Sequence, residues 1–200
     1  MYRKIVKRFL DVMLSVIGIA LLAIPMGMVA IIIKVTDPGP VFFVQKRVGK
    51  FKKEFFMYKF RSMKMSTPKD CPTHLLENPE QYITSVGKFL RKSSLDELPQ
   101  LFNICKGDMS FIGPRPALWN QYDLIAERDK YGANDVRPGL TGWAQINGRD
   151  ELEIPIKAAL DGEYVKKISF VFDCKCFLGT VISVLKSDGV VEGGTGALKQ

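Results

Sequence analysis

The sequence has few of the side chains that hold metals or form disulfide frameworks. Its 200 residues include one histidine and four cysteines, and no two cysteines stand at a CxxC spacing. A structural zinc site needs clustered nitrogen and sulfur ligands, so we do not expect one. The cysteines also lack the density of a small secreted scaffold, which favours a reducing cytoplasmic setting. Cys174 and Cys176 are interpreted as two faces of one element rather than as a redox pair.

The chain also lacks an internal repeat and a convincing interdomain linker. Its 200 residues are enough for one domain of moderate size with a real hydrophobic core. Acidic residues are in the minority, because 21 aspartates and glutamates face 29 lysines and arginines, for a net charge of +8. A basic surface of this kind suits nucleic acid, an anionic membrane face or phosphorylated substrates.

Charge is nearly absent from residues 12–35, where Lys34 is the only charged side chain. This run exceeds the roughly 20 residues that an apolar helix needs to cross a bilayer. It is longer than the apolar region of a usual signal peptide, and no clear small-residue cleavage site follows it. We therefore expect a membrane segment rather than a cleaved signal.

Pro25 lies near the middle of this run and disturbs the backbone hydrogen bonding of a helix. Basic residues flank the run on both sides, so the positive-inside rule places both flanks on the cytoplasmic face. They are Lys4, Lys7 and Arg8 at its start and Lys34, Lys46, Arg47 and Lys50 at or after its end. A re-entrant helix–break–helix over residues 1–36, bent near Pro25, satisfies both observations. Asp11 either pairs with an arginine of the soluble part or caps the helix in solvent.

The remaining sequence predicts a small, mostly helical α/β domain over residues 37–188, followed by a loose tail over residues 189–200. Residues 41–63 have the pattern of two strands joined around Gly49 and Lys50, which indicates a β-hairpin. Apolar spacing predicts amphipathic helices over residues 84–92, 96–106, 117–131, 151–167 and 171–186. The apolar face of the last helix suits either the core or a membrane interface.

Two adjacent carboxylates, Asp96 and Glu97, stand in the stretch "SSLDELPQLFN". Ser94 and Glu97 have the spacing of a capping box, and Pro99 suits the first turn of a helix. Carboxylates at a helix N-terminus are favoured by free N–H groups and by the helix dipole, which predicts an ionised Asp96. The stretch therefore fits either a helix cap or a catalytic pair.

Several cations stand in segments that restrict their motion. Arg115 lies between prolines in "FIGPRP", and Arg137 and Arg149 flank the glycine-containing stretch "VRPGLTGWAQINGR". An arginine with restricted motion loses less entropy when it binds phosphate in a bidentate way. Lys59 and Arg61 are two residues apart on the second predicted strand, which would place both on one face, toward a shared cleft.

The order of these motifs resembles the bacterial monotopic phosphoglycosyl transferases, also called bacterial sugar transferases. The resemblance rests on "KRFLDV", the apolar segment with its proline, "YKFRSM", "LRKSSLDELPQLFNICKGDMSFIGPRP" and "VRPGLTGWAQINGR". It covers nearly the whole chain, which is similar to the small members of that family. It implies a monotopic membrane enzyme of the bacterial inner membrane whose catalytic domain lies on the cytoplasmic face.

The resemblance also implies a reaction. A sugar 1-phosphate passes from a UDP-sugar to a polyprenyl phosphate such as undecaprenyl phosphate, and UMP is released as glycoconjugate or polysaccharide assembly begins. By motif, Asp96 is the nucleophile that attacks phosphorus, and Glu97 helps to hold Mg²⁺. The phosphate contacts implied in the same way are Lys59, Arg61, Arg115, Arg137 and Arg149. Partners implied are membrane lipids and, downstream, other glycosyltransferases.

The chemistry of the residues agrees with this reaction. A diphosphate repels a carboxylate, so Mg²⁺ and arginines must neutralise charge before attack. A nucleophilic aspartate divides the transfer into two steps, which lets a soluble donor and a lipid acceptor use one site in turn. Two alternatives remain open: an inactive membrane-attached scaffold for glycoconjugate enzymes, and a nucleic-acid binder suggested only by the net charge. No nucleic-acid partner is expected.

Overall fold

The computed structural model describes residues 2–67, 78–148 and 152–186. Within them the chain is mostly helical, as the sequence predicted, and it has two small two-stranded sheets. The helices are α1 (Lys7–Thr36), α2 (Ser85–Lys92), α3 (Gln100–Lys106), α4 (Tyr122–Asp129), α5 (Trp143–Ile146), α6 (Ile154–Lys167) and α7 (Phe170–Lys186). The strands are β1 (Phe42–Val48), β2 (Glu54–Phe60), β3 (Ser110–Ile112) and β4 (Gly139–Thr141).

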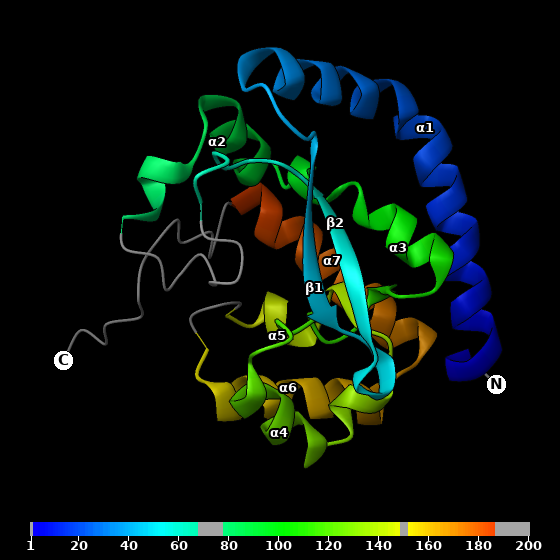
Figure 1. Cartoon of the computed structure of the whole chain (residues 1–200). Helices are drawn as coiled ribbons and strands as arrows, with labels where there is room; N and C mark the ends of the chain where they lie inside the picture. Colours follow the sequence, from blue (N-terminus) through cyan, green and yellow to red (C-terminus); the bar gives the residue numbers. More distant parts are fainter. Residues whose placement is uncertain (1, 68–77, 149–151, 187–200) are drawn as a thin grey trace.

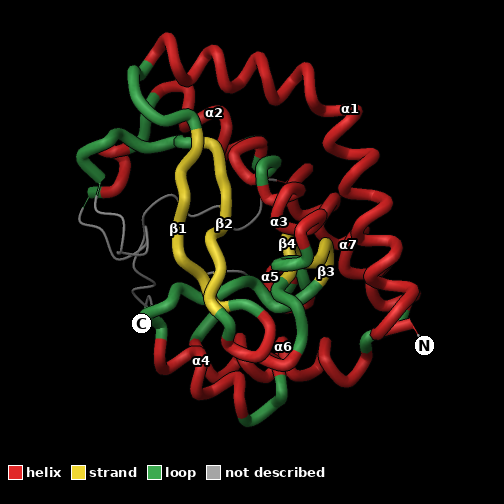
Figure 2. Tube along the Cα trace, turned by 45° about the vertical axis from the view of Figure 1, so that its right-hand side comes forward, coloured by secondary structure: helices red, strands yellow, loops and turns green. Residues whose placement is uncertain are grey.

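Helix α1 forms a long arm along one side of the molecule and then across its top (Figure 1). It is one helix of 30 residues that continues through Pro25, and it bends sharply about midway (Figures 1 and 2). The expected break is therefore a bend, because a proline removes one backbone hydrogen bond while the turns on either side persist. Among the described residues, Tyr2–Thr36 is the one helix that is long and apolar enough to cross a membrane.

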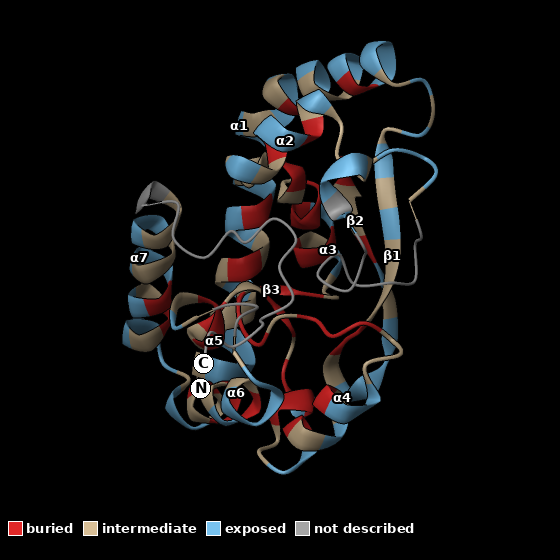
Figure 3. Ribbon diagram, turned by 90° about the vertical axis from the view of Figure 1, so that its left-hand side faces the viewer, coloured by how far each residue is buried: buried red, intermediate tan, exposed pale blue. Residues whose placement is uncertain are grey.

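One side of α1 packs on the rest of the protein. Gly18 brings the helix close to α3, since a side-chain carbon there would lie 3.3 Å from Leu101. Further along, Met26 and Ile33 pack with Phe60 and Leu90. The opposite side is strongly exposed, and Leu21 and Ile24 are among its most accessible apolar residues. Figure 3 shows this division along the helix between buried and exposed residues.

The predicted β-hairpin is confirmed. Strands β1 and β2 pair antiparallel from Phe42 opposite Phe60 to Val48 opposite Glu54, and the turn between them contains a short 3₁₀ segment, Lys50–Lys52. The second sheet pairs β3 with β4 in parallel, with Ser110 opposite Gly139. The sequence predicted only short strands in an irregular loop here. A parallel pair joins segments far apart in the chain, so local patterns do not reveal it.

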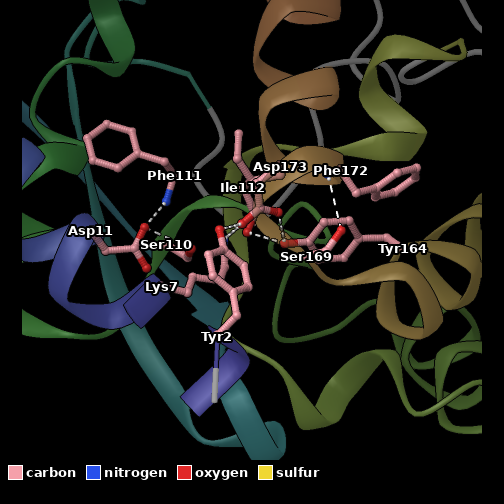
Figure 4. Close-up of polar contacts among 10 residues, drawn as sticks. All are labelled: Tyr2, Lys7, Asp11, Ser110, Phe111, Ile112, Tyr164, Ser169, Phe172 and Asp173. Carbon is pink, nitrogen blue, oxygen red and sulfur yellow. Dashed lines mark hydrogen bonds and ion pairs between the residues drawn. The ribbon is translucent and has the colours of Figure 1, made fainter. Parts of the chain in front are cut away.

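The N-terminal end of α1 is fastened to the domain by buried polar contacts (Figure 4). Asp11 accepts hydrogen bonds from the Ser110 hydroxyl and the Phe111 N–H, at 3.1 Å each, and is buried rather than a cap in solvent. Its charge also acts on an arginine of the soluble part, because it raises the pKa of Arg137. Asp173 on α7 accepts from Lys7, and also from the hydroxyls of Tyr2 and Tyr164 (Figure 4). These contacts hold the start of α1 against β3 and α7.

Helix α7 packs one face on the core, as one of the two interpretations predicted, and exposes apolar side chains on the other. Cys176 is fully buried in a cluster with Ile112 and Tyr164, while Cys174 is only partly buried, so the two cysteines do lie on different faces. Both are free thiols. The other face exposes apolar side chains: Phe170, Val171, Phe177, Leu178, Val181 and Ile182. The predicted boundaries of the membrane segment, residues 1–36, and of the catalytic domain, residues 37–188, stay predictions. The tail 189–200 lies outside the described residues.

Candidate active site

The two adjacent carboxylates lie in a 3₁₀ turn, Leu95–Glu97, that precedes α3. The prediction of a helix over 96–106 with a capping box was wrong at its start. Ser94 is in the left-handed region, with φ 57°, and makes no side-chain cap bond, and α3 begins only at Gln100 behind Pro99. The turn arises because residue 94 takes a left-handed conformation, from which a side chain does not reach the N–H groups that a regular cap binds.

Glu97 receives two cations on one carboxylate oxygen. Lys59 Nζ lies 2.7 Å from Glu97 Oε1, and Arg115 Nη2 lies 2.8 Å from the same atom. Burial by itself would raise the pKa of Glu97, but the charges of Arg115 and Lys59 and their hydrogen bonds hold that pKa well below its usual range. Glu97 is therefore ionised at neutral pH.

Asp96 has a different environment from its neighbour. Its side chain is buried, and no described residue donates a hydrogen bond to it. Desolvation raises the pKa of Asp96 above its usual value, the charge of Lys59 lowers it, and the adjacent Glu97 raises it again. The sequence predicted a lowered pKa for Asp96 at a helix N-terminus, and the structure instead raises that pKa by burial. Loss of water raises the energy of a carboxylate and makes it a stronger base and nucleophile.

Lys59 is placed by the packing of α3 on the hairpin. Asn103, a fully buried residue of α3, donates through its side-chain amide to Phe56 O at 2.8 Å. It also accepts from the Tyr58 N–H at 3.0 Å. These two bonds fix β2 relative to α3, so that the next residue, Lys59, projects toward Glu97. Sequence reasoning missed Asn103, because a buried asparagine inside an apolar helix carries no signal of its partner.

Arg115 is held through its main chain. The Arg128 Nη1 donates to Arg115 O at 2.9 Å, and Arg128 forms a buried ion pair with Asp161 at 2.6 Å, between α4 and α6. Arg47 of β1 donates to Pro116 O at 3.0 Å. The PRP segment is thus held from two sides. Neither Arg128 nor Asp161 was predicted, since they lie in helices without a recognisable motif.

The structure does not bring every predicted phosphate contact to the dyad. Arg137 Nε donates to Gly107 O at 2.9 Å, behind the far end of α3. Arg61 is buried and contacts Asp37 beyond the end of α1, through the Asp37 carbonyl and an ion pair at 3.5 Å. Lys59 and Arg61 therefore do not share a cleft, because β2 ends between them at Phe60. Arg149 lies outside the described residues.

A divalent metal ion would have few protein ligands here. Among the described residues, no group of three or more histidine, cysteine, aspartate or glutamate side chains converges. Glu97 Oε1 is shared by two cations, while no described residue donates to its second oxygen. Mg²⁺ commonly uses one or two carboxylates together with substrate phosphates. The dyad fits that arrangement, with Glu97 as the protein ligand.

A pocket opens beside Arg115, on segments that are far apart in the chain. Its walls are the end of β1, the PRP segment and part of the stretch that runs from α4 toward β4. The lining residues are Val48, Gly49, Pro114, Arg115, Pro116, Arg128, Ala133, Asn134, Val136 and Pro138. Arg115 thus contacts Glu97 and also contributes to the wall of this pocket.

Comparisons with known proteins identify the family. A family model described as "Bacterial sugar transferase" matches residues 2–187. The chain is 39% identical over 188 residues to the "Uncharacterized sugar transferase EpsL" of Bacillus subtilis, across 94% of this chain and 91% of that protein.

Two longer relatives have more specific names. One is the UDP-N-acetylgalactosamine-undecaprenyl-phosphate N-acetylgalactosaminephosphotransferase of Aeromonas hydrophila, 38% identical over 92% of this chain and 44% of that protein. The other is the UDP-glucose:undecaprenyl-phosphate glucose-1-phosphate transferase of Escherichia coli, 39% identical over 89% of this chain and 40% of that protein. The chain spans less than half the length of these two. With a family model over almost its entire length, this chain belongs to the bacterial sugar transferase family of enzymes.

Proposed function

We propose that the protein transfers a sugar 1-phosphate from a UDP-sugar to undecaprenyl phosphate and releases UMP. The observation that carries this proposal is the group formed by Lys59, Glu97 and Arg115 next to the desolvated Asp96. It combines a candidate nucleophile with cations that can neutralise phosphate. The names of the A. hydrophila and E. coli relatives support the donor and acceptor classes.

The transfer proceeds in two displacements at one phosphorus atom. A carboxylate oxygen of Asp96 attacks the β-phosphorus of the UDP-sugar, and the bond from that phosphorus to the bridging oxygen breaks. UMP leaves with the bridging oxygen and its electron pair. A phosphate oxygen of the polyprenyl phosphate then attacks the same phosphorus, and the bond to Asp96 breaks to restore the carboxylate. Two steps at one site suit a soluble donor and a lipid acceptor.

Charge neutralisation comes from the residues around Glu97. Arg115 and Lys59 lie within 2.8 Å of its carboxylate, close enough to shift onto phosphate oxygens when the donor binds. Mg²⁺, when bound through Glu97 and the diphosphate, would neutralise further charge and stabilise the leaving UMP. Among the predicted contacts, Arg61 and Arg137 would act away from the dyad, as supports of α1 and α3.

The membrane arrangement is part of the proposal. The exposed apolar side of α1 and the exposed face of α7 would lie in the bilayer and its interface. Both termini would stay on the cytoplasmic face of the inner membrane, so that α1 enters and leaves by the same side. The product, a polyprenyl diphosphate sugar, would pass to downstream glycosyltransferases.

The covalent step is tested with the donor alone. UDP-N-acetylgalactosamine, UDP-glucose and UDP-galactose are each mixed with purified enzyme in detergent, without lipid acceptor. We expect one of them to give stoichiometric UMP and a mass increase of one sugar phosphate on the peptide that contains Asp96. UMP that appears only with undecaprenyl phosphate, and no trapped adduct, would instead favour direct attack by the lipid.

The topology is tested by single cysteines at positions 2 and 38 in a variant with its four native cysteines replaced by serine. Labelling of both positions from the cytoplasmic side supports the re-entrant arrangement. Labelling from opposite sides would mean that α1 spans the bilayer.

A further inference from the structure

Two buried glutamines leave side-chain amide groups without partners. Gln100 is 1% exposed, and its Nε2 has no hydrogen-bond partner among the described residues. The Nε2 and Oε1 atoms of the buried Gln145 also have no hydrogen-bond partner among the described residues. A buried amide without a partner costs about 1–3 kcal/mol, so a protein gains stability by replacing it with an apolar side chain. A partner outside the described chain explains why such a group is kept.

Gln100 lies beside the catalytic dyad. The backbone is already helical at Leu98 and Pro99, so Gln100 follows Asp96 and Glu97 along one helical path. Side chains on a helix lean toward its N-terminus and cover the residues three and four positions earlier. For Gln100 these are Glu97 and Asp96. In that geometry the Gln100 amide would cover the dyad, although its Nε2 forms no hydrogen bond with either carboxylate.

The same face of α3 packs on β2. Asn103, one turn after Gln100, binds the backbone of β2 at Phe56 and Tyr58. Lys59, the next residue of that strand, reaches Glu97. Gln100 is buried and, three residues before Asn103, belongs to the face of α3 that packs on β2, the strand that supplies Lys59. Of the polar groups on this face, Asn103 and Lys59 bind protein atoms, and the Gln100 Nε2 binds none that the structure describes.

We propose that Gln100 is a catalytic residue of the transferase: its side-chain N–H groups bind a non-bridging oxygen of the phosphoryl group that Asp96 attacks. This inference rests on the proposed function. During attack, negative charge builds on the equatorial oxygens of phosphorus as the bond to Asp96 forms and the bond to the UMP oxygen breaks. A neutral donor held in a dry site stabilises that charge without reorganising. It also adds no cation that would lower the nucleophilicity of Asp96.

A structural role and a ligand-binding role predict opposite outcomes for Gln100→Met. Methionine has nearly the same length and needs no hydrogen bond, so the variant should be as stable as the wild type or more stable. The rate of adduct formation with saturating donor should fall at least tenfold, while KM changes by less than about threefold. The donor is whichever of UDP-N-acetylgalactosamine, UDP-glucose and UDP-galactose releases UMP with the wild type.

Gln121→Met is the matched control. Gln121 Oε1 accepts a hydrogen bond from the Leu118 N–H at 2.8 Å, so this amide has a structural partner. Its replacement should lower the melting temperature and leave the rate of adduct formation within about twofold. Gln100→Glu is the second test variant, since it keeps the shape and loses the donor, and its rate should also fall at least tenfold.

The outcomes separate the two hypotheses. A wild type that releases no UMP from any of the three donors contradicts the proposed function and the role of Gln100 with it. An active wild type with a Gln100→Met rate within twofold leaves the function intact and overturns the role of Gln100. If Gln100→Met does not fold, a wild-type rate for Gln100→Glu overturns it equally.

Discussion

Two Arg-Pro pairs flank the same short parallel sheet, and their backbones lie close together, because the Gly139 N–H donates to Pro114 O and one pocket is lined by residues of both pairs. Arg115-Pro116 follows β3, and Arg115 contacts Glu97. Arg137-Pro138 precedes β4, and Arg137 contacts Gly107 behind the other end of α3. The chain bends back after β3, so the difference between the two arginines is in the direction of their side chains. Two similar motifs therefore have different surroundings: one faces the dyad and the other closes a helix.

Arg137 shares the C-terminal end of α3 with a second arginine, Arg8. Arg8 donates to Ile104 O and Cys105 O, and Arg137 donates to Gly107 O, so both arginines neutralise the carbonyl end of α3. Burial lowers the pKa of Arg137, and the nearby charge of Arg8 lowers it further. This end of α3 is therefore held by structural contacts, whereas the other end carries the dyad to which we assign the chemistry.

The largest expected effect is at the dyad. Asp96→Asn keeps the shape of the side chain and removes the nucleophile, so UMP release and adduct formation should fall by about 10⁴-fold or more. Folding should be retained, because the carboxylate makes no hydrogen bond that a described residue donates. Activity within tenfold of the wild type would mean that the dyad end does not supply the nucleophile.

The second effect separates the two arginines directly. Arg115→Ala should lower kcat/KM by about 10²–10³-fold, since it removes a charge aimed at the reacting phosphate. Arg137→Ala should lower it by less than about tenfold and reduce stability by about 1.5–3 kcal/mol, through loss of a charged hydrogen bond. Steady-state kinetics and urea unfolding of both variants measure the difference. Equal kinetic losses would place Arg137 in the site as well.

The third effect concerns the support of Arg115. Arg128→Met leaves Asp161 buried without its partner, which should cost about 3 kcal/mol in unfolding free energy. The double variant Arg128→Met/Asp161→Leu should recover part of that stability, because no charge remains buried. Its kcat should still be reduced, since the bond to the Arg115 carbonyl is lost. Full recovery of both quantities would show that the PRP segment needs no support from α4.

The smallest effect is a shift in pH dependence. Because desolvation raises the pKa of Asp96, a proton stays on this carboxyl to higher pH than on an ordinary aspartate. Adduct formation should therefore fall on the acid side with an apparent pKa above the usual 3.8. Single-turnover rates from pH 4 to 8 at constant ionic strength measure it. A rate that keeps more than half of its maximum at pH 4 would mean that Asp96 titrates as an exposed aspartate does.

Local sequence was a good guide wherever neighbours in the chain decide the outcome. The β-hairpin formed as predicted, since its alternation and turn lie within one short stretch. The start of α3 was misplaced, because the left-handed Ser94 breaks a pattern that otherwise matches a capping box. The pairing of Lys59 with Arg61 also failed, because the strand ends between them and Arg61 turns toward Asp37.

The sequence by itself determined the apolar length of α1, the hairpin, the acidic dyad and the restricted arginine of the PRP segment. These depend on composition, periodicity and covalent neighbours, which are local properties. Only the tertiary structure decided which cations reach Glu97, which of the two buried carboxylates is left without an ion pair, and which arginine stays behind α3. Those outcomes depend on the parallel pairing of β3 with β4 and on the Asn103 bonds between α3 and β2. Contacts between distant segments set the electrostatics of Asp96 and Glu97, and no local pattern encodes them.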